Sequence, residues 1–174
     1  MYMKSKKLNK YRILSTICVI IFGIVLHFTY KLSGENKLVA WFSAINESTW
    51  EHLKLAFFPM LLTTIIGYFY LGKDVPNFLC TQVFGMISAM VFIVTFFYTY
   101  SGILGKNIAI IDIFSFFIAV VLGENLSYLL AINKIKCNKK IAIIILIIIA
   151  MAFIIFTYNT PKLGIFENPI ISII

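Results

Sequence analysis

The densest polar run in the chain spans residues 46–54, reads N-E-S-T-W-E-H-L-K, and lies directly before a long apolar stretch. Imidazole and carboxylate groups are ligands that zinc and related divalent cations accept. A histidine beside a carboxylate also suits general acid and base catalysis or a proton relay, because imidazole titrates near neutral pH. Glu51 and His52 are adjacent, so on a helix they point about 100° apart, unlike the same-face pair of an H-E-x-x-H zinc site. Metal binding and proton transfer are therefore both open.

A structural role explains part of the same run. Ser48 has the residue type of a helix N-cap, and Glu51 three residues later would complete a capping box. Acidic residues at this place also favour the positive end of the helix dipole. Capping accounts for Ser48 and Glu51 and leaves Glu47, His52 and Lys54 without a role, so both interpretations are kept.

The composition places these residues in a membrane protein. Of 174 residues, 61% are hydrophobic and 13% are charged, whereas soluble domains have about 45 to 50% apolar and about 25% charged residues. A transmembrane helix needs roughly 20 apolar residues. We therefore predict an all-α bundle of about five transmembrane helices in a single membrane domain over residues 1–174. The predicted spans cover residues 11–30, 53–71, 78–100, 108–132 and 141–158.

The segment between the first two spans is unusual. Residues 38–45 are too few to cross the bilayer and too apolar for a free loop. We expect this short segment to lie in the outer interface or to re-enter the bundle, and Trp41 suits an interface.

Small residues predict which spans touch. Gly85 with Ala89 and Ala119 with Gly123 lie four apart, which allows close approach of helix backbones. We expect spans three and four to pack together through these residues. Span five is almost entirely aliphatic, so we expect it at the edge of the bundle.

Basic residues predict the orientation, because Lys and Arg are retained on the cytoplasmic side. Ten of the fifteen fall on the side of the amino terminus, in the amino-terminal segment, at Lys73 and in residues 134–140. We therefore predict a cell-membrane protein with its amino terminus in the cytoplasm and its carboxyl terminus outside. The net charge of +8 follows from this topology, so nucleic-acid binding is excluded.

This topology brings polar residues from several spans to the outer level. Ionisable residues at membrane depth usually face a partner, the bundle interior or a water-filled cavity. The alternative for His27 is an interfacial histidine that is hydrogen-bonded to a tyrosine or a backbone carbonyl. The alternative for Tyr98 and Tyr100 is an aromatic belt at the membrane interface. The predicted metal ligands, if a metal binds, are His27, Glu51 and His52. The candidate binding pocket comprises His27, Glu47, Glu51, His52, Tyr98, Tyr100 and Asp112.

An inner polar site is predicted at Glu124 and Asn125, deep in span four. The Glu124 carboxylate needs a partner, which Lys73 or the Lys134 region could supply by snorkelling. Passage of a cation or proton past Asp112 and Glu124 is the alternative. The two acids are twelve residues apart, about 120° around an ideal helix, which weakens that idea.

The cysteines give no recognised site. Cys18, Cys80 and Cys137 are scattered singly, without C-x-x-C spacing or a nearby histidine. We expect packing roles, with neither a zinc site nor a disulfide framework.

The run at residues 46–54, followed by Pro59 in an apolar span, resembles a family of uncharacterised small bacterial multi-pass membrane proteins with an N-E-S-x-W-E-H-L-K motif. Residues 98–105 with Asp112 and residues 157–161 look like further parts of that family's pattern. The resemblance implies the topology and the motif residues and no reaction. The tail after Pro169 differs from the family's glycine-rich ending, so we expect it to be truncated or divergent.

Three functions are compatible with these residues. The first is a non-enzymatic membrane protein whose outer polar pocket binds or passes a small solute or ion. The second is an intramembrane metal-assisted or acid/base hydrolase acting on a lipid-like substrate; no nucleophile or metal motif supports it. The third is an assembly or sensory partner. We expect no cofactor, with a divalent metal as the alternative.

Overall fold

The computed structural model describes residues 2–75 and 77–169. Within them the chain is all helical, with five long helices and no strand, and each long helix is apolar enough to cross a membrane. The predicted fold class is therefore confirmed. The tail after residue 169, which we expect to be truncated or divergent, lies outside the described residues. The long helices are α1 (Tyr2–Leu32), α2 (Thr49–Leu71), α3 (Phe78–Leu104), α4 (Ala109–Ile132) and α5 (Lys139–Tyr158), with short 3₁₀ helices η1 (Val39–Trp41) and η2 (Gly164–Phe166).

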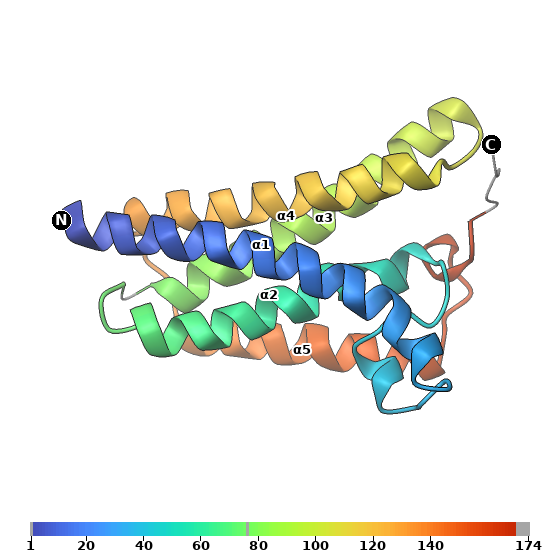
Figure 1. The fold of residues 1–174 in the computed structure, drawn as a ribbon, viewed down its shortest axis with the longest axis horizontal. Helices are drawn as coiled ribbons and strands as arrows, with labels where there is room; N and C mark the ends of the chain where they lie inside the picture. Colours follow the sequence, from blue (N-terminus) through green and yellow to red (C-terminus); the bar gives the residue numbers. More distant parts are fainter. Residues whose placement is uncertain (1, 76, 170–174) are drawn as a thin grey trace.

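The five helices lie lengthwise beside one another (Figure 1). The amino terminus shares one end of the bundle with the α2–α3 and α4–α5 connections, and the α1–α2 and α3–α4 connections lie at the other end. In this view α4 and α5 lie along opposite edges. The end opposite the amino terminus carries the polar run at residues 46–54.

Helices α3 and α4 make the closest backbone contact. A Cβ atom on Gly123 would stand 2.6 Å from the Gly85 carbonyl oxygen, and a Cβ atom on Gly85 would stand 2.0 Å from Oγ of Ser127. No side chain larger than hydrogen fits between these backbones. The predicted packing of spans three and four through small residues is confirmed.

The start of α2 confirms half of the predicted capping box. Oγ of Ser48 accepts a hydrogen bond from the Glu51 backbone N–H at 3.3 Å, as an N-cap does. The reciprocal half is wrong, because the Ser48 N–H donates to Asn46 instead. The Glu51 carboxylate accepts from the Ile45 N–H at 3.0 Å and turns into the core.

The Glu51 carboxylate forms a buried ion pair with Lys54, at 2.7 Å. The Lys54 ammonium also donates to the Ala40 carbonyl oxygen at 2.9 Å and to Oγ1 of Thr157 at 2.5 Å. Lys54 is completely buried, so these bonds replace its hydration. The pair joins α2, the α1–α2 linker and α5.

The linker between α1 and α2 folds against the bundle. Oγ of Ser43 accepts hydrogen bonds from the Tyr30 N–H and the Thr29 hydroxyl at 3.1 Å and donates to the Leu26 carbonyl. Ala40 and Ser43 are buried, although neither belongs to a long helix. This attachment to the end of α1 fixes the path of the chain toward Glu47.

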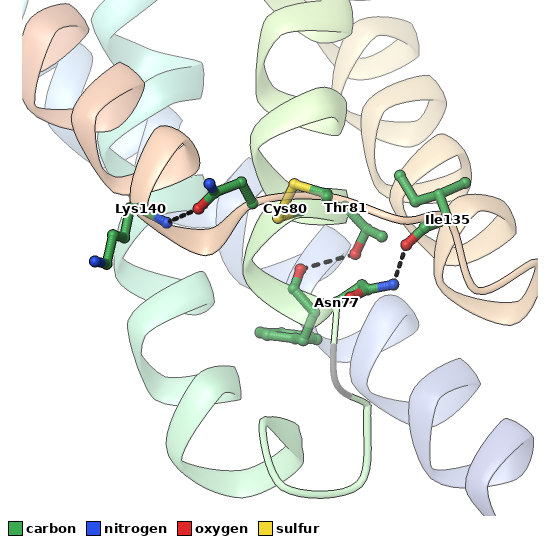
Figure 2. The surroundings of a disulfide bond; sticks show 8 residues. Asn77, Cys80, Thr81, Ile135 and Lys140 are labelled. Atoms are coloured by element: carbon green, nitrogen blue, oxygen red, sulfur yellow. Dashed lines mark hydrogen bonds between the residues drawn. A yellow bond between two sulfur atoms is a disulfide. The ribbon is translucent and has the colours of Figure 1, made fainter.

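The expectation for two of the cysteines is wrong. Cys80 at the start of α3 and Cys137 before α5 form a disulfide across 57 positions of sequence (Figure 2). Beside it the Asn77 side chain donates to the Ile135 carbonyl oxygen, so the α4–α5 connection is attached to α3 twice. Isolated cysteines on different elements carry no spacing signal, and only the packing of α3 against this connection brings them together. Cys18 is free.

Candidate metal centre

Two histidines and one glutamate converge at the end of the bundle that holds the α1–α2 linker. Nε2 of His52 lies 3.4 Å from Oε2 of Glu47, and Nε2 of His27 lies 3.9 Å from the same oxygen. One ligand atom from each residue falls within 4.8 Å of the others. The imidazole rings of the two histidines meet edge to face. Three donors of the kinds that bind zinc therefore surround one point.

Each of the three side chains comes from a different element. His27 lies near the carboxyl end of α1, Glu47 in the linker, and His52 in the first turn of α2. The Glu47 backbone N–H donates to Oδ1 of Asn168 at 3.1 Å, which anchors the linker to the carboxyl-terminal segment. Ser48 starts α2 immediately afterwards, so the capped helix sets the direction of His52 relative to Glu47.

A backbone hydrogen bond orients the His52 ring. Its Nδ1 lies 2.9 Å from the Ser48 carbonyl oxygen, which only accepts, so Nδ1 carries a proton. In the neutral ring Nε2 then holds a lone pair that faces the Glu47 carboxylate. Metal-binding histidines are oriented in the same way by a backbone carbonyl on the second ring nitrogen.

The Glu47 carboxylate and the His52 imidazole need a positive charge between them. A neutral Nε2 lone pair facing a carboxylate oxygen is repulsive, so a proton on the ring or a metal ion must separate them. The hydrogen bond from His52, aided by the charges of the two histidines, lowers the pKa of Glu47 below its ordinary value. Glu47 is therefore an ionised ligand at neutral pH.

A cavity of about 190 Å³ adjoins the trio. Its other polar groups come from α2, the α3–α4 connection and α4, and apolar side chains of α1, α2, α3 and α4 form the remaining walls. The polar lining consists of His27, Glu47, Thr49, His52, Asn107, Asp112 and Ser115. The apolar lining includes Ile24, Leu55, Ile93, Phe97, Phe116 and Phe117.

A close approach of α1 and α2 forms part of the wall of this cavity. Pro59 has no N–H, so the Leu55 carbonyl lacks the donor that a regular helix supplies four residues later. A Cβ atom on Gly23 would stand 2.7 Å from that carbonyl oxygen and 2.5 Å from the Phe116 ring. Only glycine therefore lets α1 approach α2 at this level.

Asp112 reaches the cavity from the first turn of α4. The Tyr100 hydroxyl donates to Oδ1 of Asp112 and accepts the Ile108 N–H at 3.2 Å. The Asn107 amide lies 3.4 Å from Oδ2 of Asp112. Asp112 is therefore a second carboxylate at the cavity, held in place by the α3–α4 connection.

The structure brings together part of the predicted pocket. The cavity is lined by His27, Glu47, His52 and Asp112. Tyr100 does not line it but donates a hydrogen bond to Asp112. Glu51 does not, because it pairs with Lys54 in the core, so Glu47 replaces it in the metal group. Tyr98 is 42% exposed and does not line the cavity.

Sequence reasoning missed several polar groups around the cavity. Asn107 and Ser115 flank Asp112, and their proximity to a predicted acid was the available signal. Asn168 gave no signal, because 121 positions separate it from Glu47.

The inner polar site has different partners from those predicted. Oε1 of Glu124 accepts a hydrogen bond from the buried Ser15 hydroxyl at 2.7 Å, and Arg12 donates to Asn125. The expected partners, Lys73 and the Lys134 region, are replaced by groups of α1. Arg12 also lies 5.2 Å from the centre of the Tyr128 ring. These contacts bind the amino-terminal half of α1 to α4.

Comparison with known proteins identifies one family. A family model described as "Family of unknown function (DUF6512)" matches residues 1–172. No curated protein and no solved structure matches the chain.

Proposed function

The chain belongs to the family of unknown function DUF6512, and we propose that it is a cell-membrane protein that binds a divalent transition-metal cation through His27, Glu47 and His52. The observation that carries this proposal is the convergence of two imidazole Nε2 atoms on one carboxylate oxygen. Between the Glu47 carboxylate and the Nε2 lone pair of His52, the metal ion supplies the positive charge that a proton supplies in the metal-free protein.

The donor set favours zinc-like ions over calcium and magnesium. Calcium and magnesium take oxygen ligands, whereas imidazole with carboxylate suits zinc, copper, iron and nickel. Donors on a tetrahedral zinc ion are about 3.3 Å apart for bonds near 2.0 Å. The separations of 3.4 Å and 3.9 Å from Glu47 are close to this spacing, and the three donor atoms lie within 4.8 Å of one another, so side-chain movement alone brings them to this geometry.

Metal stoichiometry and affinity test the proposal directly. Purified protein is stripped with a chelator, titrated with Zn²⁺ in a calorimeter, and analysed for bound metal by mass spectrometry. We expect one Zn²⁺ per chain and a loss of at least about tenfold in affinity in His27→Ala and in His52→Ala. Glu35→Gln is the matched control for Glu47→Gln, because Glu35 is an exposed acid of the same linker outside the cavity. The Glu35→Gln variant should bind Zn²⁺ as the unaltered protein does. Affinities equal to that of the unaltered protein in all four variants would contradict the proposal.

The orientation with the amino terminus inside places this cavity at the outer level of the membrane. This orientation is supported by the concentration of basic residues at the opposite end of the bundle. A cation would then enter from the external solution. Zn²⁺ uptake by proteoliposomes measures whether the bound ion also passes through the protein.

A second candidate function is metal-assisted hydrolysis of a lipid-like substrate. Three protein ligands leave one position of a tetrahedral zinc site open, as in catalytic sites, and the adjoining cavity has largely apolar walls. Asp112 is the second carboxylate at that cavity. A fluorogenic phospholipid ester tests this function. Zinc-dependent turnover lost in Glu47→Gln and reduced in Asp112→Asn supports hydrolysis, and zinc binding without turnover in the unaltered protein excludes it for this ester class.

A further inference from the structure

A second cavity lies at the opposite end of the bundle, between α1 and α2, and has a volume of about 330 Å³. It shares no lining residue with the cavity beside the histidines. Its lining changes in character along its length. Lys7 and Lys10 lie at one end, and Leu14, Cys18 and Ile66 continue from them.

Helical spacing explains this order of residues. Positions 7, 10, 14 and 18 follow one another by three or four residues, so they form one stripe along α1. Ile66 and Tyr70 form the matching stripe on α2, at the end where α2 approaches the membrane surface. The groove therefore runs from a cationic end toward the apolar middle of α1 and α2.

The floor of the groove is polar but already hydrogen-bonded. The Tyr11 hydroxyl donates to the Thr63 carbonyl oxygen at 3.1 Å, and the Ser15 hydroxyl is bonded to Oγ1 of Thr63 and to Glu124. These groups close the groove without offering free donors. The ammonium groups of Lys7 and Lys10 are the cationic donors of the lining, and both lysines are exposed.

The charge at this end remains positive after its local ion pair is counted. Lys7 lies 3.7 Å from Asp74, and both side chains are well exposed. Lys10 has no such partner among the ion pairs of the described residues, and it faces the groove. An anion at the Lys10 end is therefore favoured.

We propose that this groove binds an anionic phospholipid, with its phosphate at Lys7 and Lys10 and an acyl chain along Leu14, Cys18 and Ile66. Basic pockets between transmembrane helices at the membrane surface bind anionic head groups. The alignment of a cationic end with apolar side chains along the groove matches the polarity of a phospholipid, whereas a soluble anion would use only the cationic end. The site is independent of the metal centre.

Lipid retention tests this proposal. The purified protein is delipidated, incubated with phosphatidylglycerol or phosphatidylcholine, and examined by native mass spectrometry and thermal melting. We expect phosphatidylglycerol to remain bound and to raise the Tm, and phosphatidylcholine to do neither. In Lys10→Gln the affinity for phosphatidylglycerol should fall about fivefold, the loss typical of one basic residue near a membrane surface.

Two matched controls separate a built site from general attraction. Lys6→Gln removes the same charge from the same end of α1 outside the groove and should retain the lipid. Ile66→Trp fills the groove and should displace it, whereas Ile65→Trp changes an exposed neighbour outside the groove and should not. Equal binding of both lipids, or an equal loss in Lys6→Gln and Lys10→Gln, overturns the proposal. Binding of inorganic phosphate in place of phosphatidylglycerol would assign the cationic end to a soluble anion and also overturn it.

Discussion

Nε2 of His52 lies 3.4 Å from Oε2 of Glu47, with Nδ1 of the same ring committed to the Ser48 carbonyl oxygen. The close approach of these two atoms depends on a positive charge, which either a proton or a metal ion provides. Protonation of the ring is favoured at low pH, whereas metal binding is favoured at higher pH because the metal ion must displace protons. This difference makes the metal centre testable without a structure of the loaded protein.

The affinity of the protein for Zn²⁺ should grow as the pH rises from 5 to 7.5. The pKa of Glu47 lies below its ordinary value, so Glu47 is ionised through this range. Free imidazole titrates near pH 6.5, and the metal must displace its protons. The Zn²⁺ affinity should therefore fall by up to about a hundredfold per pH unit on the acid side, where two protons are displaced. Calorimetric titration at several pH values measures this dependence.

Metal-free protein should show the reverse trend. A lowered carboxylate pKa means that pairing of Glu47 stabilises the fold above the ordinary glutamate pKa near 4.3 and is lost as the pH falls through the depressed pKa. The paired imidazolium loses its charge as the pH rises past the histidine pKa. The contribution of the pair to Tm should thus be greatest near pH 5 to 6 and absent in Glu47→Gln. A difference in Tm between the unaltered protein and Glu47→Gln that does not change with pH contradicts this explanation.

Replacing Lys54 by methionine should destabilise the protein severely. Lys54 is fully buried, and its removal leaves the Glu51 carboxylate in the core without its ion-pair partner. Breaking a buried pair in this way costs about 3 to 5 kcal/mol. The loss can be measured by unfolding in mixed micelles. The double variant Lys54→Met/Glu51→Leu should be more stable than Lys54→Met alone, and a double variant at least as unstable as the sum of the two single changes would contradict the pairing.

Much of the fold followed from local sequence features. Each of the five helices is a long apolar run, and small residues four positions apart, Gly85 with Ala89 and Ala119 with Gly123, predict the α3–α4 contact. The N-cap at Ser48 was predicted because its partner is the nearby Glu51 N–H. All of these depend on residues close in sequence or on composition.

The errors share a different physical origin. A helix that is apolar all round has no amphipathic pattern to fix its rotation, so sequence does not show which polar side chain faces which neighbour. Glu51 is predicted among the metal ligands, yet its carboxylate turns into the core to pair with Lys54 and accepts a hydrogen bond from Thr157, 106 positions away. Glu124 likewise pairs with Ser15, 109 positions earlier. Long-range packing decided both.

Replacing Gly123 by alanine should weaken the contact between α3 and α4. The added Cβ atom would stand 2.6 Å from the Gly85 carbonyl oxygen, and a backbone atom cannot move aside as a flexible side chain does. Overpacking of this kind costs about 1 to 3 kcal/mol. Gly102→Ala is the matched control, because the same change in α3 meets open space. Thermal melting should show a lower Tm for Gly123→Ala alone, and equal Tm values would contradict the contact.

The predicted orientation and the disulfide indicate different redox environments for the same end of the bundle. Basic residues predict that the end with the amino terminus is cytoplasmic, where thiols are kept reduced, yet the Cys80–Cys137 bond lies at that same end. We predict that both cysteines are thiols in growing cells and that the bond forms when purified protein is oxidised. Acid quenching of intact cells, followed by alkylation under denaturing conditions at neutral pH and mass spectrometry, measures the thiols. A tag on the amino terminus, tested for protease access in spheroplasts, reports the orientation separately. A disulfide in cells together with an accessible tag would reverse the orientation and place the metal centre at the cytoplasmic level, because the two ends of the bundle exchange sides together.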